Sequence, residues 1–298
     1  MQSRVIHELR SDFKLSVLLE ATKFPKSTYM YWQQRFDRPN KDKSIEEAIK
    51  SIFEESKEAY GYRRVTAMVR KHGFIVNQKK VRRLMKKLNL KCVSFTRKSR
   101  KYNSYKGNVG TVAPNRIKQR FSTKIPYQKI TTDTSEFKIY TTNTSGKVVI
   151  KKAYFDVFLD MYNGEVLSYR LSERPNAQAI NDALREAIEI TRSCPYRRTF
   201  HSDQGWAYQM KQYSNTLKEN RIFQSMSRKG TCLDNSPMEN FFGLLKQEMY
   251  YGKTYTSFEE LNNAINNYIY FYNNKRIKEK LGWCSPAEFR LLNEPKVA

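Results

Sequence analysis

Residues 199–250 read TFHSDQGWAYQMKQYSNTLKENRIFQSMSRKGTCLDNSPMENFFGLLKQEMY and contain two carboxylates in settings that suit catalysis. Asp203 follows the short run Thr199–Phe200 and precedes Gln204–Gly205, which predicts a strand that ends in a turn. Open α/β folds place their functional groups at such strand ends. The second carboxylate is Glu239, and 35 residues separate it from Asp203.

Glu239 is expected near the start of a helix, because Ser236 is a favourable N-cap and Pro237 suits the first helical turn. A third carboxylate, Asp133, lies in an alternating, strand-like run from Ile130 to Tyr140. Carboxylates on two strands and one helix can converge on a divalent cation, since Mg²⁺ prefers hard oxygen ligands. Spacing alone does not select these three, because the chain has 29 acidic residues.

Longer motifs around these carboxylates are more specific. They read His201-Ser-Asp203-Gln-Gly-Trp, Leu-Asp-Asn-Ser-Pro-Met-Glu239-Asn-Phe-Phe-Gly-Leu-Leu-Lys246, Tyr272-Asn-Asn-Lys-Arg276 and Leu281-Gly-Trp-Cys-Ser-Pro286. Together they resemble the bacterial insertion-sequence transposases with a retroviral-integrase-like DDE core. The most similar type is the second reading-frame product of elements that use translational frameshifting. The resemblance covers nearly the whole chain.

This resemblance implies an α/β, RNase H-like integrase core preceded by all-α, helix-turn-helix-type DNA-binding modules. It implies that Asp133, Asp203 and Glu239 hold two Mg²⁺ ions, with Mn²⁺ able to substitute. Water would first cut a strand at each transposon end, and the freed 3′-hydroxyl would then attack another phosphodiester. It also implies double-stranded DNA as partner and substrate, a homo-oligomer of at least two chains on DNA, and an upstream reading-frame product as a fusion or a partner.

Composition independently favours a polyanionic partner. The 298 residues carry a net charge of +26, and nucleic acid is the first candidate for such a chain. A membrane surface is the second, but the sequence lacks an apolar run of membrane-spanning length and a signal-peptide core. We therefore expect a cytoplasmic protein that works on bacterial DNA. The four scattered cysteines predict neither a zinc site nor a disulfide framework.

Four regions are predicted along the chain. Residues 1–36 form an N-terminal helix-turn-helix-like unit, in which Ser27 caps the second helix and which either contacts DNA or only packs. Residues 44–90 form a second helical DNA-binding module, 91–126 a basic linker, and 127–298 the catalytic core with a C-terminal helical extension. The core is predicted to contain strands at 130–140, 148–159 and 166–171, a helix at 176–192, a strand before Asp203 and a helix at 207–220. A helix over residues 257–275 would begin with a capping box of Ser257 and Glu260.

A continuous stretch of 74 residues, 59–132, contains 21 Lys and Arg residues and no acidic residue. Such self-repulsion destabilises a fold unless phosphate offsets it, so DNA contact is a better reading than an ordinary solvated face. The expected DNA-contact residues are Arg63, Arg64, Lys79, Lys80, Arg82, Arg83, Lys86, Arg97, Arg100, Lys101, Arg116, Arg120 and, in the core, Lys246.

Supporting roles are predicted for residues beside the carboxylates. Lys246 lies two helical turns after Glu239 and would hold a phosphate near the metals. His201 and Gln204 either touch substrate or metal or are structural, and Asn235 either steadies the site loop or is a helix cap. The chain departs from the family pattern at Lys278, where a histidine is common, so no histidine role is transferred.

Two other functions remain open at this level. One is an RNase H-like endonuclease that hydrolyses DNA without joining it, and the other is a catalytically inactive DNA-binding repressor. A basic structural protein would leave the motifs at Asp203 and Glu239 unexplained.

Overall fold

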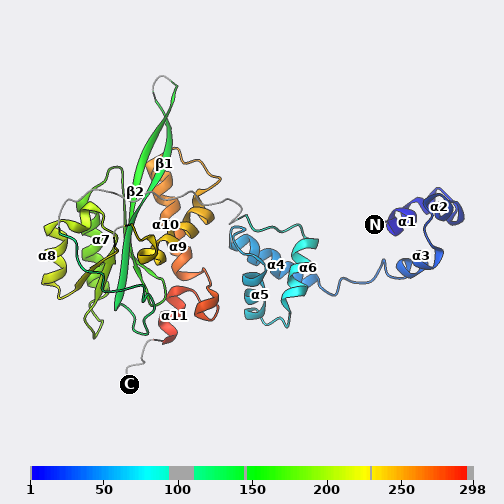
Figure 1. Ribbon diagram of the computed structural model, residues 1–298. Coiled ribbons are helices and arrows are strands. Elements are labelled where there is room, and N and C mark those ends of the chain that lie inside the picture. Colours follow the sequence, from blue (N-terminus) through cyan, green and yellow to red (C-terminus); the bar gives the residue numbers. More distant parts are fainter. Residues whose placement is uncertain (1, 94–110, 144–145, 229, 294–298) are drawn as a thin grey trace. The chain divides into compact units, whose positions relative to one another are not determined.

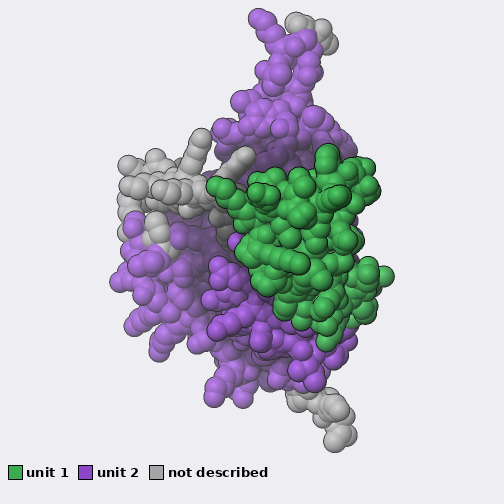
Figure 2. Space-filling model, turned by 90° about the vertical axis from the view of Figure 1, so that its right-hand side faces the viewer, with its two compact units in different colours: residues 1–51 green, residues 52–298 purple. Residues whose placement is uncertain are grey.

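The computed structural model describes residues 2–93, 111–143, 146–228 and 230–293. They divide into two compact units, Met1–Ser51 and Ile52–Ala298, which Figure 2 colours green and purple. The division falls inside helix α4 (Lys43–Glu55), so it does not coincide with the predicted boundary between residues 36 and 44. We describe each unit by itself.

The N-terminal unit begins with three short helices, α1 (Gln2–Glu8), α2 (Leu15–Thr22) and α3 (Lys26–Gln33). Their small core consists of Ile6, Leu18 and Tyr29. The predicted cap at Ser27 is wrong. Pro25 takes the N-cap position without a side-chain cap, because its fixed backbone angle suits entry into the helix and makes a polar cap unnecessary.

The second unit opens with α5 (Tyr62–Lys71) and α6 (Gln78–Lys87). Asn77 caps α6, since its side chain accepts a hydrogen bond from the Lys80 amide at 2.7 Å. Helix α6 buries Val81 and Leu84, and its basic residues are left on the other faces. The sequence pattern of apolar residues three and four apart therefore predicted this amphipathic helix correctly.

A mixed five-stranded sheet forms the centre of the second unit, in the order β3-β2-β1-β4-β5. Strands β1, β2 and β3 form an antiparallel meander, whereas β4 and β5 run parallel to β1. The strands are β1 (Lys129–Thr142), β2 (Val148–Asp160), β3 (Val166–Ser172), β4 (Thr199–Ser202) and β5 (Phe223–Met226).

Helices cover both faces of the sheet (Figure 1). On one face, α7 (Ala177–Ile190) and α8 (Lys211–Glu219) pack on a core that includes Ile130, Phe158 and Phe200. On the other face, α9 (Ser236–Leu245) and α10 (Phe258–Asn274) enclose a core with Phe155 and Leu159. This three-layer arrangement is the predicted α/β core. A 3₁₀ turn (Glu279–Leu281) and α11 (Pro286–Asn293) follow.

Several predicted boundaries differ from the structure. The predicted helix at 207–220 is a 3₁₀ turn (Trp206–Gln209) followed by α8. Helix α9 starts one residue earlier than predicted, so Asn235 and not Ser236 occupies the N-cap position. The Asn235 side chain makes no capping bond there and bonds to Thr131 on β1. Strand β1 continues to Thr142, two residues beyond its predicted end.

The end of α9 and the start of α10 have further features. Helix α9 ends at Leu245 and continues as a π-helical turn, Lys246–Tyr250. Ser257 caps α10 as predicted, but the reciprocal bond of Glu260 goes to the amide of Thr256, at 2.8 Å, rather than to Ser257. Among the described helices, none has both the length and the apolar character needed to span a bilayer.

A buried ion pair holds the π-helical turn against the end of α10. The Arg276 guanidinium donates to both carboxylate oxygens of Glu248, with a shortest distance of 2.6 Å, and the Tyr268 hydroxyl donates to the same carboxylate. Both charged side chains are 2% exposed. Burial opposes the charge of Arg276, but Glu248 outweighs it and holds the pKa of Arg276 above its usual value, so the guanidinium stays charged.

Removing one charge of this pair is expected to destabilise the protein. Glu248→Gln leaves the Arg276 cation buried without a counter-charge, which costs about 3 kcal/mol in comparable pairs. We expect a correspondingly lower urea midpoint for unfolding of the core, measured by circular dichroism. Glu189→Gln is the control, because Glu189 and Arg192 form an exposed pair at 3.1 Å and lose less than about 0.5 kcal/mol. Equal losses in both variants would contradict the assignment.

Candidate active site

Asp133 and Asp203 come together because β1 and β4 run parallel in a matched register. Lys129 lies beside Thr199, and Thr131 lies beside His201. Asp133 is four residues beyond Lys129, and Asp203 is four residues beyond Thr199. The two carboxylates therefore meet where β4 ends, although 69 residues separate them in the sequence.

A tight turn aims the Asp203 carboxylate. The Gly205 amide donates to Asp203 Oδ1 at 2.8 Å. A Cβ atom on Gly205 would lie 2.9 Å from this same oxygen and 3.2 Å from the Tyr208 ring. The turn requires glycine because of this close approach, and not because of a left-handed backbone, since φ at Gly205 is −58°.

Mutual repulsion marks these carboxylates as a single electrostatic group. Burial, followed by the negative charges of Asp203 and Glu239, raises the pKa of Asp133 well above its usual value. The Thr134 amide opposes this by donating to Asp133 Oδ1 at 2.8 Å. Burial also raises the pKa of Asp203. Raised pKa values in neighbouring acids are typical of functional sites.

Glu239 lies in the first turn of α9, as predicted, and its side chain is exposed. The part of the carboxyl that is shielded from water raises the pKa of Glu239. The charge of Glu239 in turn raises the pKa of Asp133. Among the described residues, no three His, Cys, Asp or Glu side chains lie close enough together to enclose a metal ion. The charge of Asp203 raises the pKa of Asp133 more than the charge of Glu239 does.

Lys246 supplies positive charge at the same site. Its ammonium lies 5.1 Å from the centre of the Phe137 ring. Burial lowers the pKa of Lys246, and the charges of Asp133 and Glu136 partly offset that effect. Lys246 therefore lies within electrostatic range of Asp133 and Glu136.

Asn235 connects the start of α9 to the strand that carries Asp133. It is buried, and its Oδ1 accepts a hydrogen bond from the Thr131 hydroxyl at 2.6 Å. Its Nδ2 donates to the Thr132 carbonyl at 3.4 Å. These bonds fix the position of α9, and hence of Glu239, relative to β1.

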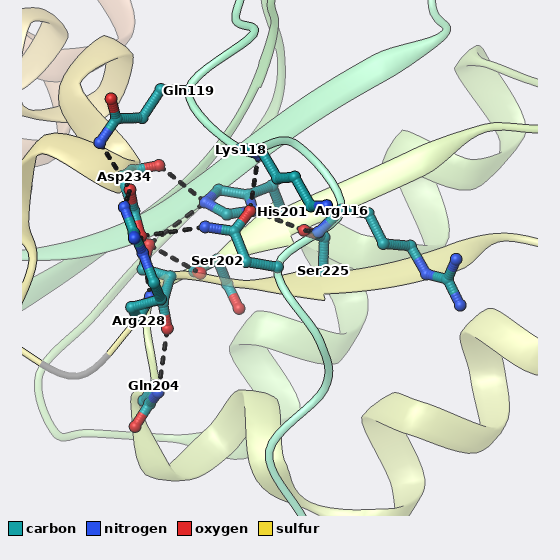
Figure 3. A network of polar contacts seen from close by, with 11 residues as sticks. Arg116, Lys118, Gln119, His201, Ser202, Gln204, Ser225, Arg228 and Asp234 are labelled. Carbon is teal, nitrogen blue, oxygen red and sulfur yellow. Dashed lines mark hydrogen bonds and ion pairs between the residues drawn. The ribbon is translucent and has the colours of Figure 1, made fainter.

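His201 is fully buried and part of a hydrogen-bond network (Figure 3). The Asp234 carbonyl can only accept, so His201 Nε2–H donates to it at 2.8 Å. In the neutral ring Nδ1 then accepts from the Ser225 hydroxyl at 2.8 Å, and Ser225 accepts from the Arg116 amide. Burial lowers the pKa of His201, so the ring is neutral and both of its nitrogens are engaged within the protein. This geometry favours the structural role for His201 over contact with substrate or metal.

Asp234 organises the loop before α9 and was not singled out in the sequence. Its buried carboxylate accepts hydrogen bonds from Asn115 at 2.9 Å and from Gln119 at 3.0 Å. It also forms an ion pair with Arg228 at 2.9 Å, and Arg228 is the main reason that the pKa of Asp234 lies far below its usual range. The sequence feature that could have identified Asp234 is its position as an acidic residue directly before the Asn-Ser-Pro helix start.

Gln204 and two further acids are also held by internal hydrogen bonds. Gln204 Nε2 donates to the Ser227 carbonyl at 2.9 Å. Asp156 accepts from the Thr134 hydroxyl at 2.6 Å, and burial raises its pKa to about 6. Asp160 accepts from the amides of Tyr127 and Tyr162, and burial raises its pKa to about 7.

The expected DNA-contact residues fall into three groups. Exposed on the structure are Arg63, Lys79, Arg82, Arg83, Lys86, Arg116 and Arg120. Lys80 is half-buried, and Arg64 is half-buried with its guanidinium 3.9 Å from the Glu248 carboxylate. Arg97, Arg100 and Lys101 lie outside the described residues.

Lys278 is half-buried and holds a turn. Its Nζ donates to the carbonyls of Asn163 and Gly164 at 3.2 and 3.1 Å and to the Tyr272 hydroxyl at 2.9 Å. Burial lowers its pKa well below the usual value. In this chain the position thus fastens the β2–β3 turn to the end of α10.

Comparison with known proteins agrees with this architecture. Residues 39–99 match the HTH-like domain family, and residues 123–232 and 239–293 match two integrase core domain families. The chain is therefore a protein with an integrase core and a helical, HTH-like region before it.

Relatives define the family more narrowly. InsK of Escherichia coli K12, described as a candidate transposase for insertion sequence element IS150, is 40% identical over 288 residues, which cover 96% of this chain and 97% of InsK. Transposase InsF for IS3A from the same organism is 29% identical and covers 97% and 98% of the two chains. The chain belongs to the transposases of bacterial insertion sequences.

Solved structures that resemble the chain include retroviral integrases. The simian T-cell lymphotropic virus intasome matches with a TM-score of 0.46 and 15% identity, over 78% of this chain and 72% of that one. The HTLV-2 integrase catalytic core in complex with magnesium matches with a TM-score of 0.40 and 16% identity, over 55% and 97%.

The Gly205 turn provides a sharp test of the site. Gly205→Ala is expected to keep the fold, since its φ is accessible to alanine, but to displace the Asp203 carboxylate. A displacement of about 1 Å can cost roughly 100-fold in rate. DNA cleavage in the presence of Mg²⁺ measures the loss. Gly243→Ala in α9 is the matched control, because its Cβ meets nothing within 4 Å, and full activity of both variants would contradict the role of the turn.

Proposed function

We propose that this transposase cuts DNA at the ends of its insertion sequence and joins the freed 3′ ends to target DNA, with Asp133, Asp203 and Glu239 as the catalytic carboxylates. The observation that carries the proposal is the pairing of Asp133 and Asp203 at the end of β4, where the charges of Asp203 and Glu239 both act on Asp133. Like charges held close together lower the stability of a fold. A role in binding metal cations or in phosphate chemistry explains why these carboxylates are present.

The donor set fits divalent metal. All three candidate ligands are carboxylates, which are the hard oxygen donors that Mg²⁺ prefers, and a cation would offset the repulsion that raises the pKa of Asp133. When bound, two such ions would polarise the scissile phosphate and stabilise the charge on the attacking and leaving oxygens. The number and identity of the ions belong to this proposal, as does the assignment of Glu239 as a ligand.

The chain's own residues would then bind and orient the DNA. The Lys246 ammonium, beside Asp133, is suited to hold a phosphate oxygen at the site. Asn235 and the Gly205 amide keep the carboxylate-bearing elements in place. Phosphoryl transfer depends mainly on positioning and charge stabilisation, so a covalent protein intermediate is not required.

Double-stranded DNA is the proposed partner of the helical module. The exposed residues Lys79, Arg82, Arg83 and Lys86 give α6 a basic face that can neutralise phosphates. We further propose that at least two chains assemble on paired DNA ends, that an upstream reading-frame product acts as fusion or partner, and that the protein works on DNA in the bacterial cytoplasm.

The decisive experiment compares the wild type with Glu239→Gln on a labelled transposon-end duplex with Mg²⁺ or Mn²⁺. Glutamine keeps the shape of the side chain but removes its charge. We expect metal-dependent cut and joined products from the wild type, and a loss of at least about 100-fold in the variant. Gel electrophoresis separates cleavage from joining.

Each other outcome identifies a different function. Cleavage without joining would favour an endonuclease. Tight end binding without any cleavage, including with the upstream product added, would favour a repressor. Equal activity of wild type and Glu239→Gln would disprove the assignment of Glu239.

Metal binding can be tested without catalysis. Asp133→Asn removes the carboxylate that suffers the strongest repulsion, so the variant without metal should melt about 2–4 °C above the wild type. Adding Mg²⁺ should raise the melting temperature of the wild type and leave that of Asp133→Asn unchanged. Asp182→Asn, an exposed acid on α7, should behave like the wild type. An equal Mg²⁺ response in all three proteins would argue against metal at this site.

A further inference from the structure

Strands β1 and β2 continue beyond the sheet as an antiparallel arm. Figure 1 shows the two strands rising past all neighbouring elements, and Figure 2 shows the same projection in space-filling form. The register pairs Lys138 with Lys152, Tyr140 with Ile150, and Thr142 with Val148. Because paired residues share a face, these six side chains form one face of the arm, which we call the ribbon face.

The ribbon face is uncovered and partly apolar. Val148 is 67% exposed, Ile150 53% and Tyr140 36%. On the opposite face, by contrast, Phe137 and Ile139 at the base of the arm are buried in the core formed with α9 and α10. Contiguous exposed apolar side chains on one face mark an interaction surface.

The positive charge of the arm favours a DNA duplex as its partner. Four lysines, Lys138, Lys147, Lys151 and Lys152, are exposed on its described part. Glu136 at its base is the acid there, and it forms an ion pair with Lys152 at 3.0 Å. Four cations around a two-stranded ribbon suit a duplex, since such a ribbon fits a DNA groove and the lysines can contact the flanking phosphates.

The arm and the candidate active site share strand β1. Tyr140 lies seven residues beyond Asp133 on the same strand, a distance of roughly 23 Å. The arm therefore extends from the point where the target phosphodiester must be placed for joining.

We propose that the ribbon face binds the target duplex next to the phosphodiester that is attacked. This inference rests on the proposed function of the carboxylates. The ribbon face carries Lys, Thr, Val, Ile and Tyr, and it lacks the Arg, Asn and Gln side chains that read base edges bidentately. It suits sequence-independent phosphate contact, as a variable target requires, better than recognition of a fixed terminal sequence. Val148 and Ile150 can enter a groove as apolar wedges.

Two double variants of the full chain separate the parts of this surface. Lys138→Gln/Lys152→Gln removes the two lysines of the ribbon face. Val148→Thr/Ile150→Thr removes apolar contact but keeps β-branched side chains that favour the strand. Lys211→Gln/Lys218→Gln on α8 removes the same charge from an exposed helix and serves as the control. Circular dichroism melting checks that all variants remain folded.

The first measurement is the fluorescence anisotropy of a labelled random-sequence duplex at several salt concentrations, which requires no catalysis. The charge variant should bind about 10-fold more weakly, and its log–log salt slope should fall by about 2, one per lost phosphate contact. The apolar variant should bind more weakly with an unchanged slope. The control should match the wild type more closely than either variant.

The second measurement is strand transfer from pre-cut transposon ends, together with cleavage of uncut ends. Transfer should fall about 10-fold in the charge variant, as its duplex affinity does, and cleavage should stay unchanged. Unchanged duplex binding by both arm variants would overturn the proposal. An equal fall in end binding and cleavage would assign the arm to the ends, and a change of molecular mass in light scattering without a DNA effect would assign it to a second copy. Inactive wild type with normal arm-dependent binding would contradict the catalytic proposal alone.

Discussion

Repulsion between carboxylates at the end of β4 is the constraint around which the core is built. Asp133 and Asp203 are forced together by the register of β1 and β4, and their charged forms are disfavoured by burial. The fold tolerates them because backbone amides of Thr134 and Gly205 donate to one oxygen of each. Those hydrogen bonds also fix the directions of the carboxylates, which leaves the remaining lone pairs for ligands.

Glu239 reaches the same edge through the loop that precedes α9. The Asp234 carboxylate gathers Asn115, Gln119 and Arg228, and its carbonyl accepts from the neutral His201 ring. Segments that are far apart in the sequence are thereby joined within a few residues of the third carboxylate. A buried network of this kind is stable only when every member has a partner, and so it defines one position for the start of α9.

The far end of α9 is tied to the helical module of the same unit. Glu248, two residues after Lys246, binds Arg276, and the Arg64 guanidinium lies 3.9 Å from the same carboxylate. The Tyr60 hydroxyl donates to the Lys275 carbonyl at 3.0 Å and accepts from the Ile277 amide. Arg64 of α5 therefore contacts the turn that carries Lys246, and Tyr60, just before α5, contacts the segment after α10. These contacts give the basic module a direct physical connection to the candidate site.

Local sequence determined the helices, most strand positions and the character of the site. The caps at Asn77 and Ser257, the alternation around Asp133 and the family motifs at Asp203 and Glu239 act over a few residues, so they can be read directly. Only the tertiary structure decided what depends on partners distant in sequence. It buried His201 against Ser225, bonded the Asn235 side chain to Thr131 on β1, placed Arg64 beside Glu248 and assembled the Asp234 network. The physical reason is that hydrogen bonding and burial are set by the sheet register and helix packing, which no single stretch of the chain encodes.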